Sequence, residues 1–389
     1  MNAEQIIFSG DLRFNVIAGV VDLATMGLAV HLQRRGVRNR RVWLALSPLF
    51  AVHGIVALLI ALDLRLRIFA VLRWVGMALF WHVPPLLLAL AWLFRSDRRE
   101  SRKISVLAAV LVLVHIWAYW IEPFWLEVTR YELTHPRLAG LTRPVVVAQV
   151  SDIQVDSVGE YERRAISTLA GLKPDLVLYT GDFAQVESEQ EYARLLALLG
   201  DLIDKAGPRP PLGSYAVCGD VDLTDPGDRR TDGTWAAAMV AAGITPLRDS
   251  TVILSLPGCA VNLIALDVVT SRATLPAHLR AAARGRDERL FDLVIGHSPD
   301  YAEVLSQLGR PFLALAGHTH GGQVQIPGVG PLVTLSRLPR RFADGFLPFG
   351  PGTLSTSRGI GVERYDAPRL RLFCRPELRL VTLRPPPRR

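Results

Sequence analysis

Five segments between residues 143 and 385 combine an apolar run with a side chain that could bind a metal ion. The segments read VSDIQVD, LYTGDF, AVCGDVD, VIGHSPD and LAGHTHGGQ. The candidate ligands that they supply are Asp152, Gln154, Asp182, Asp220, His297, His318 and His320. Carboxylates and imidazoles form the mixed oxygen and nitrogen set of hydrolytic metal centres. The three aspartates and three histidines together therefore predict a dinuclear hydrolytic site, in which the amide of Gln154 is an unusual neighbour.

Most of these residues also have a structural explanation when each is taken alone. Asp182 and Asp220 follow glycines, where an aspartate often caps a helix or starts a turn. His297 precedes Ser-Pro and could be a hydrogen-bonded loop residue. The sequence GHTHGG is more specific, because it places two imidazoles one residue apart between glycines at the end of an apolar strand.

The elements that must position these residues alternate between short apolar runs and helical stretches. Strands are expected at 144–151, 175–180, 214–218, 252–256, 261–266, 291–296, 312–316, 322–326, 353–357, 369–374 and 378–383. Helices are expected at 160–172, 189–204, 233–242, 275–285 and 299–308. The first half reads strand–helix–strand, which predicts parallel pairing, and the second half adds strands without helices. This pattern favours a two-sheet α/β sandwich with its ligands at the carboxyl ends of the strands.

The order and spacing of these motifs resemble the calcineurin-like metallophosphoesterase family. GHTHGGQVQIPGVGPL and STSRGIG are similar to the membrane-anchored bacterial branch, which includes relatives of lipid A precursor pyrophosphatases. The resemblance implies a four-layer α/β/β/α sandwich in which two metals orient a phosphate and generate a bridging hydroxide. It assigns Asp152, the Gln154 position, Asp182 and His320 to one metal, and Asp182, Asp220, His297 and His318 to the other. Catalysis would depend chiefly on Asp182, Asp220 and His318.

Three positions depart from the family pattern. Gln154 stands where the family has a metal-binding histidine, and Asp220 and Val221 stand where it has asparagine and histidine. An amide is a weaker ligand than imidazole for Zn²⁺ or Fe²⁺, whereas the extra carboxylate adds charge, so the divalent metals expected are Mn²⁺ or Mg²⁺, with Mn²⁺ favoured. Val221 cannot replace the histidine that assists the leaving group, which leaves Asp222 or a water as a partial substitute.

Four apolar runs in the first 125 residues predict four transmembrane helices, at 14–32, 42–62, 68–94 and 104–125. The predicted domains are a membrane domain (1–125), a linker (126–142), a metallophosphoesterase-like domain (143–385) and a tail (386–389). Two basic loops, 34–41 and 95–103, face the cytoplasm under the positive-inside rule. The soluble domain would then lie outside the cytoplasm, at a bacterial inner or plasma membrane.

The net charge of +8 does not indicate a nucleic-acid partner. The positive surplus lies within residues 1–103, and the remaining chain has as many acidic as basic residues. Three cysteines, Cys218, Cys259 and Cys374, have no metal-ligand spacing and are expected to be thiols.

Ionisable residues inside the apolar runs suggest a further role for the membrane region. His53, His82 and His115 lie on three different runs and could bind a haem, although hydrogen bonding between helices explains them as well. Asp22 and Arg73 are expected to pair with each other.

Two functions follow from the sequence. The first is a membrane-anchored, metal-dependent phosphoesterase or pyrophosphatase acting on a phosphate ester, with a lipid-linked ester among the candidate substrates. The alternative is a catalytically degenerate relative that acts as a binding or scaffold module, for which Gln154 and Val221 are the grounds.

Overall fold

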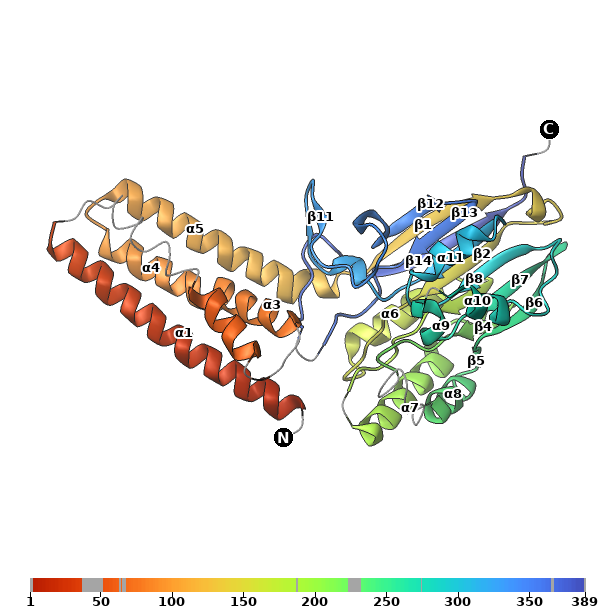
Figure 1. Cartoon of the computed structure of the whole chain (residues 1–389), viewed down its shortest axis with the longest axis horizontal. Helices are drawn as coiled ribbons and strands as arrows, with labels where there is room; N and C mark the ends of the chain where they lie inside the picture. Colours follow the sequence, from red (N-terminus) through yellow and green to blue (C-terminus); the bar gives the residue numbers. More distant parts are fainter. Residues whose placement is uncertain are drawn as a thin grey trace. The chain divides into compact units, whose positions relative to one another are not determined.

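The chain folds into two compact units in the computed structural model (Figure 1). The described residues are 3–36, 52–62, 64, 68–186, 188–222, 232–273, 275–364 and 367–387. Unit 1 comprises Met1–Ile121 and Glu363–Arg369, and unit 2 comprises Glu122–Val362 and Leu370–Arg389.

Unit 1 is helical. Its elements are α1 (Ala3–Arg34), α3 (Ile68–Met77), the π-helical turn η1 (Ala78–His82), α4 (Val83–Leu93), α5 (Arg98–Ile116) and η2 (Trp117–Ile121). Three segments are long and apolar enough to cross a membrane: Gly10–Arg34, Phe69–Leu93 and Arg98–Phe124. Val52–Leu62 is a shorter apolar helix, and residues 42–51 of the second predicted span lie outside the described residues.

The helices of unit 1 expose apolar side chains and enclose polar ones. Leu23 and Leu113 are 74% and 65% exposed, as expected of side chains that face lipid. The predicted pair between Asp22 and Arg73 is wrong. Arg73 binds both oxygens of Asp11, at 3.2 and 2.6 Å, while Asp22 contacts two histidines. Asp11 lies about three helical turns before Asp22, and the sequence could not show which carboxylate faces Arg73.

The first sheet of unit 2 has six strands in the order β1-β14-β2-β3-β4-β5. They are β1 (Glu127–Thr134), β14 (Glu377–Arg384), β2 (Val145–Val150), β3 (Leu176–Tyr179), β4 (Ser214–Ala216) and β5 (Thr245–Pro246). From β2 to β5 the strands run parallel, and β14 is antiparallel to β2. The parallel part is the one that the strand–helix–strand pattern predicts.

The second sheet has the order β12-β13-β9-β8-β7-β6. Its strands are β6 (Ser250–Leu256), β7 (Cys259–Ala265), β8 (Phe291–Ile295), β9 (Phe312–Ala316), β12 (Gly345–Phe349) and β13 (Gly352–Thr356). A separate two-stranded pairing joins β10 (Gln325–Ile326) to β11 (Gly330–Pro331). The two large sheets face each other across a dry core that includes Val147 and Leu178 from one sheet and Leu263 and Leu313 from the other.

Helices cover the outer face of each sheet. Against the first sheet pack α6 (Glu160–Gly171), α7 (Glu189–Ala206) and α8 (Asp232–Ala241). Against the second pack α10 (Pro276–Ala282), α11 (Tyr301–Gln307) and the short turn η6 (Arg340–Phe342), and α9 (Val268–Ala273) follows β7. The result is the predicted four-layer α/β/β/α sandwich (Figure 1).

Several local expectations differ from the structure. The expected linker 126–142 contains β1, which pairs in parallel with β14 over eight residues. The expected loop 327–349 contains β12, and the short helix α9 was not expected. Residues 369–374 form no strand and make one isolated bridge, between Leu372 and Val324. Edge strands and short bridges depend on distant partners, which local sequence does not identify.

Candidate metal centre

The seven candidate ligands follow five strands of the two sheets. Asp152 and Gln154 follow β2, Asp182 follows β3, Asp220 follows β4, His297 follows β8, and His318 and His320 follow β9. Five of them have left-handed backbone conformations: Asp152 (φ 49°), Gln154 (45°), Asp182 (60°), His318 (68°) and His320 (49°). Such conformations are unfavourable for residues with a side chain and concentrate at functional sites. The tight loops direct these side chains toward a common region.

Glycines let these loops approach one another. A Cβ on Gly317 would overlap Ser151 and the Asp152 carboxylate, and a Cβ on Gly219 would overlap Asp182. Gly359 and Gly361, from the STSRGIG motif, lie against Asp152 and the Ile153 carbonyl in the same way. The motif that resembled the family therefore has a packing role beside the first candidate ligand.

The substitution Gly317→Ala tests this packing. We expect it to lower the free energy of unfolding by about 1–3 kcal/mol, because the new methyl group must displace Ser151 or Asp152. Chemical denaturation of the full-length protein measures the change. Gly171→Ala at the end of α6 is the control, since no atom lies within 4 Å of its Cβ position. Equal stability of the two variants would contradict the packing argument.

One candidate cluster contains Asp220, His297 and His318. His297 Nε2 lies 2.9 Å from Asp220 Oδ1 and 3.2 Å from His318 Nδ1. His318 Nδ1 is 3.4 Å from the same Asp220 oxygen. Both imidazoles are buried, and their rings meet edge to face with centroids 4.9 Å apart. One ligand atom from each residue lies within 4.8 Å of the others, which suits a single metal ion.

The tautomer of His297 indicates that a cation belongs here. His297 Nδ1 lies 2.8 Å from the Thr180 carbonyl oxygen, which only accepts, so Nδ1 carries the proton. Neutral His297 then directs the Nε2 lone pair at Asp220 Oδ1 and at Asp182 Oδ2, 3.2 Å away. These atoms repel one another unless a proton or a metal ion lies between them. The donor set fits a divalent metal, and the bond to a backbone carbonyl is the usual outer support of a metal-binding histidine.

The second cluster contains Asp152, Asp182 and His297, again with one ligand atom each within 4.8 Å. Asp182 thus lies next to both clusters, as a bridging carboxylate would. Gln154 Nε2 donates to Asp182 Oδ2 at 3.2 Å, so the amide that replaces a family histidine faces this cluster. His320 Nε2 is 3.5 Å from Asp152 Oδ1. The structure thus brings all seven predicted residues into two adjoining groups.

Burial changes the pKa values of several ionisable groups of the site. Burial raises the pKa of Asp182 to about 7, and the neighbouring Asp220 and Asp152 carboxylates act in the same direction against His297. Burial also lowers the pKa of His320 to about 4. A bound cation would favour the ionised carboxylate and the neutral imidazole, which are the forms that bind metals.

Asp222 has a structural role that the sequence did not reveal. Its carboxylate accepts hydrogen bonds from the backbone N–H groups of Asp182 (2.8 Å) and Gly219 (2.9 Å), and Phe183 N–H donates to its other oxygen at 2.8 Å. The side chain is 1% exposed. Asp222 therefore ties the loops after β3 and β4 together and is not placed to protonate a leaving group, in contrast to our expectation.

Two arginines beside the site were also not predicted. Arg272, on α9, donates from Nη1 to Asp220 Oδ2 at 2.7 Å, which leaves Asp220 Oδ1 for the histidines. Arg371 is fully buried, donates to the carbonyl oxygens of Arg358 and Gly361, and has Nη2 3.4 Å from His320 Nδ1. Neither arginine belongs to a short motif, so only the fold identifies them.

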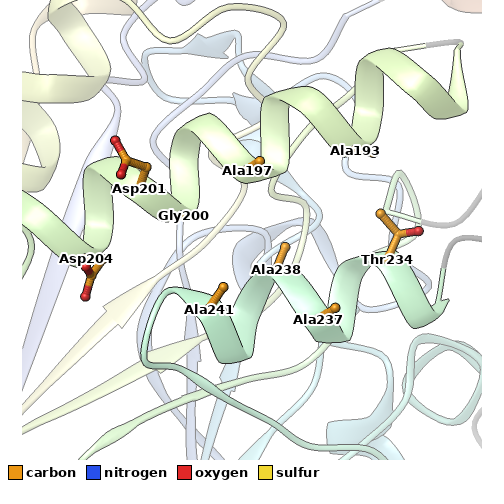
Figure 2. Close-up of a pocket in the computed structure, with 9 residues that line it drawn as sticks. All are labelled: Ala193, Ala197, Gly200, Asp201, Asp204, Thr234, Ala237, Ala238 and Ala241. Carbon is orange, nitrogen blue, oxygen red and sulfur yellow. The ribbon is translucent and has the colours of Figure 1, made fainter.

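A separate pocket lies between α7 and α8 (Figure 2). Its volume is about 380 Å³, and its lining residues are Ala193, Ala197, Gly200, Asp201, Asp204, Thr234, Ala237, Ala238 and Ala241. None of the candidate metal ligands lines it. The small side chains allow the two helices to approach closely, and the pocket is a groove of that helix packing.

Comparison with known proteins finds relatives of unit 2's size. The chain is 28% identical over 273 residues to the uncharacterized metallophosphoesterase YkuE of Bacillus subtilis, which covers 69% of this chain and 89% of the relative. It is 26% identical over 271 residues to the phosphodiesterase YaeI of Escherichia coli, covering 69% and 92%. Over 124 residues it is 27% identical to the UDP-2,3-diacylglucosamine pyrophosphatase LpxG of Chlamydia muridarum, covering 31% and 35%. No protein-family model matches the chain.

Two facing sheets covered by helices, with carboxylates and imidazoles at the carboxyl ends of the strands, define the class of metal-dependent phosphoester hydrolases. The names of the first two relatives, a metallophosphoesterase and a phosphodiesterase, indicate the same class. The similarity to these relatives supports the calcineurin-like metallophosphoesterase family for this chain.

Proposed function

We propose that the protein is a membrane-anchored phosphoesterase or pyrophosphatase that hydrolyses a lipid-linked phosphate ester with two divalent metal ions. The observation that supports it most directly is the position of His297 Nε2, which lies 3.2 Å from Asp182 Oδ2 and 2.9 Å from Asp220 Oδ1 in a buried site. Hydrolysis by two metals needs such a pair of adjoining donor groups.

The chain's own residues have distinct tasks in this proposal. Asp152, Gln154, Asp182 and His320 would hold one metal, and Asp182, Asp220, His297 and His318 the other. When bound, the metals would polarise the phosphoryl oxygens and activate the attacking water. The Thr180 carbonyl keeps the His297 proton on Nδ1, Arg272 orients Asp220, and Asp222 holds the ligand loops at a constant separation.

The donor set favours Mn²⁺ or Mg²⁺ over Zn²⁺ and Fe²⁺, with Mn²⁺ preferred. Gln154 offers an amide oxygen where an imidazole would select softer metals, and Asp220 adds a carboxylate. Both side chains face the clusters.

The lipid-linked substrate and the membrane location rest on two further observations. LpxG is named a pyrophosphatase of UDP-2,3-diacylglucosamine, which carries two acyl chains. The described residues of unit 1 include three helices long and apolar enough to cross a membrane. Under the positive-inside rule, the basic loops support a location of unit 2 outside the cytoplasm. Cleavage of unit 2 by an external protease in intact cells tests this orientation, and protection until lysis would reverse it.

Metal-dependent hydrolysis by the full-length protein is the decisive measurement. The detergent-purified protein, stripped with a chelator, should be inactive toward bis(p-nitrophenyl) phosphate and regain activity with Mn²⁺ more than with Zn²⁺. Metal content should rise to about two ions per unit 2 when activity is restored. No hydrolysis with any of Mn²⁺, Mg²⁺, Fe²⁺ or Zn²⁺ would refute the enzymatic proposal.

A binding or scaffold role is the second candidate, because Val221 offers no proton to a leaving group and Asp222 is held in backbone hydrogen bonds. Under this alternative the protein would bind metal and a phosphate ester but leave the ester intact. Equilibrium binding of a phosphate ester, measured beside the hydrolysis assay, separates the two functions.

A further inference from the structure

A polar cluster lies inside the helix bundle of unit 1. Asp22 comes from α1, His53 from the helix Val52–Leu62, and His82 from the π-helical turn η1. His53 Nε2 is 3.2 Å from Asp22 Oδ1, and His82 Nδ1 is 2.8 Å from Asp22 Oδ2. The three side chains are 3%, 20% and 13% exposed for His53, Asp22 and His82. Three segments far apart in the sequence thus bring two imidazoles to one carboxylate.

The tautomer of His82 is set by Asn15. The Asn15 amide nitrogen donates to the Asp11 carbonyl oxygen at 2.7 Å, so its oxygen is the atom that faces His82 Nε2, 2.9 Å away. That oxygen accepts, and His82 therefore carries its proton on Nε2. Neutral His82 then directs the Nδ1 lone pair at the Asp22 carboxylate. Two lone pairs repel at 2.8 Å, so either a proton or a metal ion lies between these atoms.

Among the described residues, the arginine of α3 contacts a different carboxylate. Arg73 donates to both oxygens of Asp11, and Trp74 Nε1–H donates to Asp11 as well. Beside its polar contacts with Asp22 and Asn15, His82 meets the buried Phe14 ring edge to face, with centroids 6.0 Å apart. Burying a charged carboxylate among apolar helices costs free energy unless an opposite charge lies nearby. A cation bound to Asp22 would supply that charge.

The geometry fits a metal ion. One ligand atom from each of Asp22, His53 and His82 lies within 4.8 Å of the others. In a tetrahedral site with bonds of about 2.1 Å, neighbouring ligand atoms lie about 3.4 Å apart. The contact between His53 Nε2 and Asp22 Oδ1, at 3.2 Å, is close to that separation, whereas His82 Nδ1 lies at hydrogen-bond distance, 2.8 Å, from Asp22 Oδ2 and would move outward to admit an ion. Asn15 provides the outer hydrogen bond that metal-binding histidines require. The arrangement differs from two axial haem ligands, because both imidazoles share one carboxylate.

The π-helical turn gives His82 its direction. η1 (Ala78–His82) precedes Pro84 and Pro85, which lack the N–H groups that would bond to the carbonyls of this turn. The helix widens there by one residue, and such single turns occur often at functional sites. The irregular turn thus has a local cause and places an imidazole beside Asp22.

We propose that Asp22, His53 and His82 bind one divalent transition-metal ion of the Zn²⁺ class within the bundle, separate from the centre in unit 2. Two imidazoles and one carboxylate leave a fourth coordination position for water or a substrate group. This site is independent of the proposed hydrolysis.

The site in unit 1 is tested by metal retention in a full-length variant whose metal centre in unit 2 has been removed. The background substitutions Asp182→Asn and His318→Gln remove ligands from both clusters of that centre. After chelation, reloading with Zn²⁺ and removal of excess metal, this background should retain about one ion per chain. Adding His82→Gln should abolish retention, whereas His115→Gln should not, since His115 packs on Phe80 and Tyr119 away from the cluster.

A second variant, Asn15→Leu, keeps all three ligands and tests the site in case His82→Gln loses metal because it misfolds. Asn15→Leu removes the acceptor that sets the His82 tautomer and should weaken Zn²⁺ binding by about 10–100-fold. Co²⁺ loaded in place of Zn²⁺ should give visible absorption bands that Asn15→Leu weakens. Loss of all metal from the background, or equal retention with and without His82→Gln, would overturn the proposal and leave a hydrogen-bonded cluster only.

Discussion

The substitution Asp182→Asn is expected to lower phosphodiester hydrolysis by roughly 10²–10³-fold and to reduce the metal content of unit 2. Asp182 lies between the two clusters: its Oδ2 is 3.2 Å from His297 Nε2, and its Oδ1 accepts from Val221 N–H at 3.1 Å. An asparagine keeps the size of the side chain but removes the negative charge that two cations would share. Hydrolysis of bis(p-nitrophenyl) phosphate and metal analysis of the same samples measure the two effects.

Asp156→Asn is the matched control for this experiment. Asp156 lies four residues after Asp152 on the same segment, is partly exposed, and contacts the Ser157 hydroxyl. We expect its activity and metal content to equal those of the unmodified protein. If Asp182→Asn retained full metal content and activity, Asp182 would have no bridging role and the dinuclear proposal would be wrong.

The substitution Val221→His should raise hydrolysis of esters with poor leaving groups by about 10²-fold. Val221 is anchored by its own N–H group on Asp182, so its side chain starts beside the candidate centre. Asp222 cannot supply the proton, because its carboxylate is engaged by the loop N–H groups. An imidazole at position 221 would restore a proton donor. Alkyl phosphodiesters need that proton, whereas nitrophenyl esters leave without it and should gain little.

Val221→Gln separates proton donation from polarity at the same position. Glutamine can hydrogen bond to a phosphate but cannot protonate a leaving group at neutral pH. Val221→His should therefore exceed Val221→Gln on alkyl esters and match it on nitrophenyl esters. If the two variants gained activity equally, the absence of a proton donor at position 221 would not be what limits hydrolysis. Gln154→His, which replaces the amide that faces Asp182, should raise metal affinity without this leaving-group dependence.

The ends of the buried strands could be predicted because their signal is local. Runs such as 144–151 and 312–316 are apolar on both faces, as central strands require, and each meets a glycine or polar residue where the backbone turns. Parallel order then places Asp152, Asp182 and Asp220 at one edge. The GHTHGG motif supplied the imidazoles. The family, the sandwich and the candidate ligands therefore followed from composition and motifs alone.

Tertiary structure decided which charges compensate one another. Asp11 and Asp22 both lie on α1, yet Arg73 binds Asp11, and Asp22 faces His53 and His82. Helix rotation and packing set these pairs, and neither changes the local sequence pattern.

The same limit applies to the candidate metal centre. Sequence identified Asp222 only as a neighbour of Val221, while the fold brings its carboxylate to N–H groups of two loops. Arg272 and Arg371 reach Asp220 and His320 from distant segments. Residue types and strand ends determined which side chains could bind metal, because those signals are local. The contacts that orient and neutralise them form only when the chain is packed, because they join segments that the sequence keeps apart.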